Sequence, residues 1–69
     1  MSVNRRDLVR HLEQYGFFLQ RDGGNHSLYS NGRGKMLPIK RHATFYLLSA
    51  NALCKQAGIP AIFWPGRRG

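Results

Sequence analysis

The chain has 69 residues, of which 11 are Lys or Arg and only three are Asp or Glu, so its formal net charge at pH 7 is +8. This length allows one domain with a thin core, which excludes a deep pocket for a large cofactor. So large a positive excess on one small domain usually faces an anionic partner, which is nucleic acid, an acidic protein or an anionic membrane.

Further classes of protein are excluded by what the sequence lacks. No run of about 18 apolar residues exists, so we expect no membrane span. No apolar core follows the N-terminal charges, so we expect no signal peptide. The single Cys54 rules out an intramolecular disulfide and is typical of the reducing cytoplasm, where we expect the protein to act. The three His residues and Cys54 lack the close spacing of zinc ligands, so we expect neither a metal nor a cofactor.

The first predicted element is a helix over residues 5–15. Asn4 is placed to cap it, and Asp7 lies in its first turn, where a carboxylate favours the positive end of the helix dipole. Gly16 ends the helix. The apolar face has the spacing i, i+3, i+4 and i+7 and consists of Leu8, His11, Leu12 and Tyr15.

Three short extended segments follow, separated by residues typical of turns. The first covers residues 17–21 and ends at the turn signal Asp-Gly-Gly-Asn of residues 22–25. The second covers residues 26–30 and is closed by Asn31-Gly32, a dipeptide favoured in two-residue hairpins. The third covers residues 35–39, and Pro38, which lacks a backbone donor, predicts an edge strand or a strand end there.

A second helix is predicted before Gly58, which ends it, and Pro60, which prevents it from resuming. Its apolar stripe consists of Ala50, Leu53, Cys54 and Ala57. The order of helix, three-stranded antiparallel meander and helix predicts an α+β fold, with both helices on one face of the sheet and the other face open. This is the layout of double-stranded RNA-binding domains. We expect residues 1–59 to form one domain, followed by a tail over residues 60–69 that folds over the sheet edge, meets a partner or is disordered.

Three stretches of this sequence share their order and spacing with one family of small basic proteins. The first stretch contains Gly16-Phe17, then Arg21, and then residues 24–29 (Gly-Asn-His-Ser-Leu-Tyr). The second is residues 37–42 (Leu-Pro-Ile-Lys-Arg-His), and the third is residues 50–59, which end in Gly-Ile. Over about residues 5–59 the chain resembles HicA toxins, which are bacterial ribonucleases paired with HicB antitoxins. The resemblance implies a fold like that of double-stranded RNA-binding domains, cleavage of mRNA that blocks translation, and a HicB-like antitoxin as partner. It also implies a catalytic histidine at the Gly-x-His position, which is His26.

Two departures from the family pattern affect the predicted site. Asn25 stands where the family often has Ser, which keeps a small polar turn residue. Ser27 stands where many members have a second His, so an acid/base scheme with histidines at positions 26 and 27 is impossible here. One histidine is sufficient in principle, because RNA carries its own nucleophile in the 2′-hydroxyl and imidazole can remove that proton without a metal.

The residues themselves leave alternatives beside these roles. The Gly-Gly turn before His26 exposes its imidazole, yet a turn histidine that only forms hydrogen bonds fits the local sequence too. We expect His11, on the apolar helix face, to be structural. Tyr29 and Cys54 are expected to lie in the core, and Phe17, Phe18 and Leu28 to pack in the sheet rather than stack on bases. The residues that we expect to contact RNA phosphate or ribose are Arg21, Asn25, Ser27, Lys35, Lys40, Arg41 and His42. The alternative for each of them is a solvated side chain or a turn cap.

The function that the sequence predicts is a metal-independent endoribonuclease that acts as the toxin of a toxin–antitoxin system. His26 is its expected general base, with mRNA and an acidic HicB-like antitoxin as its partners. The alternative is a non-catalytic module of the double-stranded-RNA-binding type, which explains the charge and the fold but gives His26 no catalytic role. A third possibility, a DNA-binding or ribosome-associated protein, lacks support because the sequence has no helix-turn-helix pattern.

Overall fold

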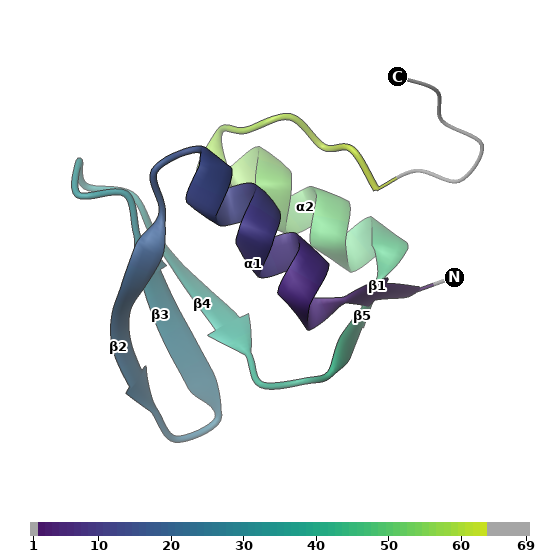
Figure 1. Ribbon diagram of the computed structural model, residues 1–69, viewed down its shortest axis with the longest axis horizontal. Helices are drawn as coiled ribbons and strands as arrows, with labels where there is room; N and C mark the ends of the chain where they lie inside the picture. The colour runs from purple at the N-terminus through teal and green to yellow at the C-terminus, as the bar shows by residue number, and fades with distance from the viewer. Residues whose placement is uncertain (1, 64–69) are drawn as a thin grey trace.

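The computed structural model describes residues 2–63, which form seven elements (Figure 1). In chain order they are β1 (Ser2–Asn4), α1 (Arg5–Gln14), β2 (Phe18–Gly23), β3 (His26–Ser30), β4 (Met36–Lys40), β5 (Thr44–Tyr46) and α2 (Leu47–Ala57). Strands β2, β3 and β4 form an antiparallel sheet in that order. The predicted α+β layout of helix, three-stranded antiparallel sheet and helix is therefore confirmed.

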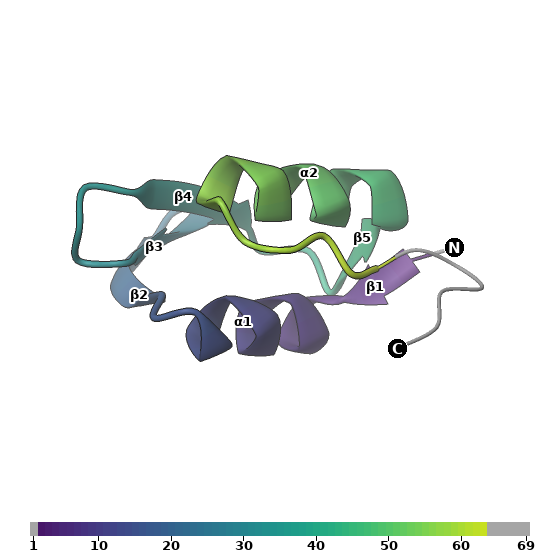
Figure 2. The ribbon, with the colours of Figure 1, turned by 90° about the horizontal axis from the view of Figure 1, so that it is seen from above.

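The core lies between the two helices and one face of the sheet (Figures 1 and 2). Along β3 and β4 the side chains alternate, so Tyr29, Leu37 and Ile39 point into the core and their neighbours point away from it. The buried helix residues that meet them are Leu8, Leu12, Ala50, Cys54 and Ala57. The burial predicted for Tyr29 and Cys54 is confirmed, and within residues 2–63 no helix covers the opposite face of the sheet.

A second, two-stranded sheet was not predicted. β1 pairs with β5 in antiparallel register, with the buried side chains of Val3 and Phe45 directly opposite each other. Each of these strands runs straight into a helix, β1 into α1 and β5 into α2, so the pair ties the starts of the two helices together. Asn4 precedes α1 as predicted and its backbone ends β1, but its side chain makes no capping hydrogen bond.

The two hairpins of the main sheet differ from the prediction. β2 continues through Gly23, which leaves Gly24-Asn25 as a two-residue turn, and Gly24 has the positive φ of +60° that such turns require. The Asn31-Gly32 dipeptide does not form a two-residue turn, because five residues separate β3 from β4. In that longer loop the Asn31 Oδ1 atom accepts hydrogen bonds from the backbone amides of Arg33 and Lys35, at 2.7 and 3.1 Å.

Residues 60–63 pack against the helices instead of the sheet edge. α2 ends at Ala57 and is followed by Gly58 in the left-handed conformation, with φ +76°. The chain then turns back and runs between α1 and α2 (Figure 2). The Pro60 carbonyl accepts a 2.7 Å hydrogen bond from His11 Nε2, and the Phe63 amide donates a 2.9 Å hydrogen bond to Asn51 Oδ1. His11 is buried between Tyr15 and Phe63, so the structural role predicted for it is confirmed. The rest of the predicted tail, residues 64–69, lies outside the described residues.

Candidate nucleic-acid interface

His26 begins β3 on the face of the sheet that carries no helix. Its partner across β4 is Lys40, and its partner across β2 is Gly23. Residues directly opposite in antiparallel strands point to the same face, with Cβ atoms about 4.5–5.5 Å apart, so Lys40 stands beside the imidazole. Gly23 has no side chain, and a Cβ at that position would meet nothing within 4 Å. The imidazole is thus exposed, with a cation on one side and open space on the other.

A β-bulge places Arg21 on the same face. The register of β2 against β3 shifts between Leu19, which faces Tyr29, and Arg21, which faces Leu28. In a regular ladder Arg21 would face Ser27, and its side chain would point to the helix side of the sheet. The extra residue in β2 turns Arg21 to the open face and brings Asp22 opposite Ser27, which is the kind of reorientation that bulges produce.

The far end of the open face is apolar. Phe18 and Met36 flank Ser30 there from the two neighbouring strands, and they are 49% and 46% exposed. The prediction that Phe18 packs inside the sheet is therefore wrong, because the alternation that buries Phe17 sends the next side chain outward. Leu28, in the middle of the face, is half-buried.

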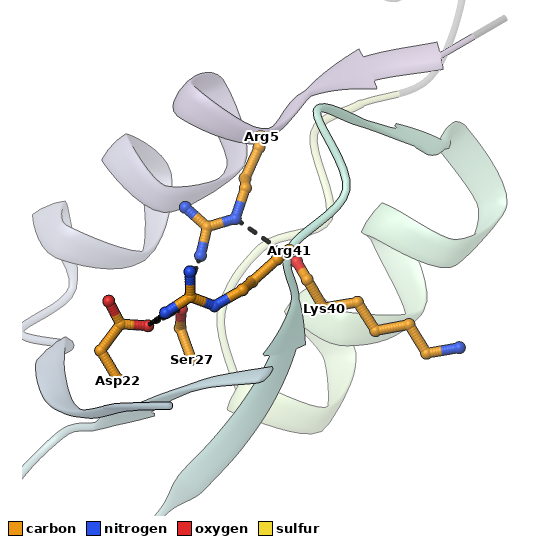
Figure 3. Close-up of polar contacts among 5 residues, drawn as sticks. All are labelled: Arg5, Asp22, Ser27, Lys40 and Arg41. Atoms are coloured by element: carbon orange, nitrogen blue, oxygen red, sulfur yellow. Dashed lines mark hydrogen bonds and ion pairs between the residues drawn. The ribbon is translucent and has the colours of Figure 1, made fainter. Parts of the chain in front are cut away.

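Four polar side chains gather on the helix side of the sheet, next to the β2–β3 turn (Figure 3). We name Arg5, Asp22, Ser27 and Arg41 the Asp22 network. Arg5 Nη2 donates to Ser27 Oγ at 2.9 Å, and Ser27 Oγ donates to Asp22 Oδ1 at 2.8 Å. Arg41 forms an ion pair with the same carboxylate oxygen. Figure 3 shows the side chain of Lys40 pointing away from this network.

The electrostatics of the network centre on Asp22. The hydrogen bond from Ser27 is the largest cause that lowers the pKa of the Asp22 carboxyl below its ordinary value of 3.8, and the positive charges of Arg41 and Arg5 act in the same direction. Partial desolvation acts against them. The carboxylate is therefore held ionised, and it offsets the repulsion between the two guanidinium groups.

The network also fixes the turn that carries His26. The Arg41 amide donates a 3.2 Å hydrogen bond to the carbonyl of Asn25, which ties the loop after β4 to the β2–β3 turn. Arg5 Nε donates to the Lys40 carbonyl at 3.3 Å, and the Arg5 amide donates to the Ala43 carbonyl at 2.8 Å. The N-terminal end of α1 is thereby joined to the backbone on both sides of Arg41.

Six of the seven residues predicted to contact RNA fall into three groups. Arg21 and Lys40 share the open face with His26, and the exposed Asn25 directly precedes it in the turn. Ser27 and Arg41 belong to the Asp22 network, where Ser27 is only 3% exposed and the Arg41 side chain is 47% exposed. Lys35 lies in the loop at the other end of the sheet, opposite Asn31, so it is about five residues along the strands and about 17 Å from His26.

His42 lies in the loop between β4 and β5, where its ring stacks on Phe45 with the ring centres 6.0 Å apart. It lines a surface groove together with Lys40, the residue beside His26. The sequence reasoning missed Arg5 and Asp22. Arg5 is 22 residues from Ser27 in the chain and belongs to a helix start, so no local pattern connects it to the turn.

Within residues 2–63, no group of three or more His, Cys, Asp or Glu side chains is arranged to hold a metal ion. Over the same residues, no helix has both the length and the apolar character needed to cross a membrane.

Comparison with known proteins identifies the family. The family model described as the HicA toxin of bacterial toxin–antitoxin systems matches residues 5–59. No curated protein and no solved structure gives a match. The matched span runs from the first residue of α1 past the end of α2 and includes the whole β2–β3–β4 sheet. The protein therefore belongs to the HicA family and is the toxin of a toxin–antitoxin system.

Proposed function

We propose that the protein is a metal-independent endoribonuclease that cleaves mRNA and thereby blocks translation, with His26 as its general base. The observation that carries this proposal is the position of His26, exposed on the open sheet face between Lys40 and the side-chain-free Gly23. An RNA backbone can lie along this face because no helix covers it and a net charge of +8 attracts the phosphates.

The reaction uses the nucleophile that RNA itself supplies. His26 removes the proton of a ribose 2′-hydroxyl, and the 2′-oxygen attacks the adjacent phosphorus. The bond from phosphorus to the 5′-oxygen of the next nucleotide breaks, which leaves a 2′,3′-cyclic phosphate and, after protonation of the leaving oxygen by solvent or by His42, a 5′-hydroxyl. Lys40 and Arg21, on the same face, stabilise the charge that develops on the phosphate oxygens.

In this mechanism the Asp22 network positions the base. Its members lie on the helix side of the sheet, so they do not contact RNA at His26, but they hold the β2–β3 turn against α1 and the loop after β4. Preorganisation of this kind matters because small displacements of a catalytic group cost large factors in rate.

Purified protein, single-stranded RNA and excess EDTA test the proposal. The native protein is expected to cleave, and His26→Ala is expected to cleave about 10²–10⁴-fold more slowly, which is the usual contribution of a positioned acid/base group. Lys55→Ala, an exposed position on α2, serves as the control and should cleave at the native rate. Intact RNA after incubation with the native protein would contradict the proposal. Growth inhibition by His26→Ala equal to that by the native protein, with RNA binding retained, would favour the non-catalytic RNA-binding module.

We further propose that the antitoxin is an acidic, HicB-like protein that covers the basic open face. Such a partner blocks access to His26 and relieves the repulsion among the cations, so the complex should be tight and should weaken as salt is added. Co-purification with the acidic product of a neighbouring gene, followed by a salt titration, checks this expectation. A neighbourhood without such a gene would contradict it.

A further inference from the structure

A groove of about 500 Å³ lies along the free edge of β4, where β4, the following loop, β5 and one side of α2 meet. Its volume is within the range of about 300–1,000 Å³ that is typical of small-ligand sites. The fold does not account for it, and of its lining the proposed cleavage step uses only Lys40 and, where it protonates the leaving oxygen, His42. We name it the α2 groove, and its polar lining consists of Lys40, His42, Thr44, Tyr46, Ser49 and Gln56.

The α2 groove adjoins the candidate site through Lys40. This residue is the cross-strand neighbour of His26 and also lines the groove, so a chain whose phosphate lies at His26 and Lys40 has the groove directly beside it. Figure 3 shows that the Lys40 side chain extends away from the Asp22 network. A single polynucleotide strand can therefore occupy both places at once.

The lining has the chemistry of a site for a flat, polar ring. Its aromatic residues are Phe45, His42, whose ring stacks on Phe45, and Tyr46, which is 58% exposed. Ser49, Thr44 and the Gln56 amide supply both donors and acceptors of hydrogen bonds. No lining residue is acidic, whereas Lys40 brings a positive charge. Stacking surfaces beside hydrogen-bonding groups and a cation are what proteins use to hold an unstacked base of RNA.

On α2 the groove depends on a small residue. Ser49, Ala52 and Gln56 lie at i, i+3 and i+7, so they share one helix face. Ala52 stands between the two polar side chains and is exposed, which leaves space in the middle of the lining.

We propose that the α2 groove binds one nucleobase of single-stranded RNA, from a nucleotide adjacent to the one whose 2′-hydroxyl faces His26. The inference rests on the proposed ribonuclease function and names its substrate class as unpaired RNA. A base within a duplex is paired and stacked on its neighbours, so it enters a groove on the protein surface only after unpairing and unstacking, which costs about a few kcal/mol, whereas an unpaired base does not have this cost. The nuclease is therefore selective for single strands, and the α2 groove sets its nucleotide preference beside the cut.

The test measures binding without cleavage, by using His26→Ala as the background. The probes are a fluorescent eight-nucleotide single-stranded RNA and a hairpin in which the same eight nucleotides are paired. Ala52→Phe fills the groove and is expected to weaken binding of the single strand about tenfold or more, which corresponds to the loss of a stacked base. Leu48→Phe, at another exposed position of α2 that does not line the groove, is the matched control and should bind as the background does.

Titration of the four nucleoside 3′-monophosphates into isotope-labelled His26→Ala protein locates the site directly. We expect chemical-shift changes at His42, Tyr46 and Gln56 that Ala52→Phe abolishes. Unchanged single-strand binding by Ala52→Phe, or equal binding of the paired hairpin, would overturn the proposal even if the native protein cleaves RNA. If Ala52→Phe weakens single-strand binding but the native protein does not cleave RNA, the proposal that the α2 groove binds a base is supported, and only the proposed nuclease activity is contradicted.

Discussion

Asp22 is one of three acidic residues in a chain with 11 Lys and Arg, and it is placed where two of those cations converge. Its carboxylate pairs with Arg41 and accepts a hydrogen bond from Ser27, whose hydroxyl in turn accepts one from Arg5. A neutral residue at position 22 would leave two guanidinium groups facing each other across the buried Ser27 hydroxyl. The single carboxylate thus matters more than its exposed position suggests.

The pH dependence of stability should reveal this role. Because the pKa of Asp22 is lower in the folded protein than its ordinary value of 3.8, the ionised form favours folding. This contribution is fully present above pH 3.8 and is lost as the pH falls through the lowered pKa. Asp22→Asn should therefore melt at a lower temperature than the native protein at pH 7, and the difference should shrink below pH 3.8.

Thermal melts at pH 7 and at pH 2.5, followed by circular dichroism, measure the effect. Glu13→Gln, which removes an exposed carboxylate from α1 outside the Asp22 network, is the control for the loss of one negative charge. A melting difference for Asp22→Asn that stays constant between the two pH values would show that the carboxylate charge has no part in stability.

At the scale of elements, the β2–β3 hairpin decides which side chains accompany His26. The bulge after Leu19 sends Arg21 to the open face and Asp22 to the helix side, so one extra residue separates the groups beside RNA from the groups that brace the turn. The tight Gly24-Asn25 turn then sets His26 directly at the start of β3.

The two adjacent glycines of this hairpin should respond differently to the same substitution. Gly24 has φ +60°, a conformation that costs an L-residue roughly 1–2 kcal/mol, so Gly24→Ala should lower the free energy of unfolding by about that amount. Gly23 has no positive φ and a Cβ there meets nothing within 4 Å, so Gly23→Ala should be neutral or slightly stabilising. Urea unfolding of both variants measures the difference. Equal losses in the two would mean that the turn conformation is not what requires glycine.

At the scale of the whole molecule, the charges are distributed rather than clustered. Arg21 and Lys40 lie on the open face, Arg5 and Arg41 are committed to the Asp22 network, and Lys35 lies at the far end of the sheet. Only some of the net charge of +8 is therefore placed to contact phosphates at His26.

The salt dependence of RNA binding measures how many of these charges contact phosphates. For single strands the logarithm of the binding constant falls with the logarithm of salt concentration, with a slope of about −0.7 per phosphate neutralised. In the His26→Ala background, Lys40→Gln should reduce the steepness of this slope by about 0.7. Lys55→Gln removes the same charge from an exposed position on α2 outside the groove, and it should leave the slope unchanged. Anisotropy titrations between 50 and 200 mM salt provide the slopes, and equal slopes for the two variants would place Lys40 outside the RNA contact.

Sequence by itself determined the parts of this protein that depend on local patterns. The apolar spacing of Leu8, His11 and Leu12 identified α1, and the apolar stripe before Gly58 identified α2. Turn residues separated the three strands of the main sheet, and β3 has the predicted bounds. The charge imbalance predicted an anionic partner, and the resemblance to HicA toxins implied RNA as the target and His26, at the Gly-x-His position, as the catalytic residue, because composition and the order of short motifs need no tertiary contact.

Only the tertiary structure decided which residues meet. The β1–β5 pair escaped prediction because three-residue strands are too short to show alternation and their partners are about 40 residues apart. The bulge escaped prediction too, and with it the opposite faces of Arg21 and Asp22, because a register shift leaves no mark in the sequence. Ser27, predicted to contact RNA, is buried beside Asp22 because the pleat sends successive side chains to opposite faces. Local periodicity fixes an element, whereas the neighbours of a side chain depend on pairing and packing between segments that are distant in the chain.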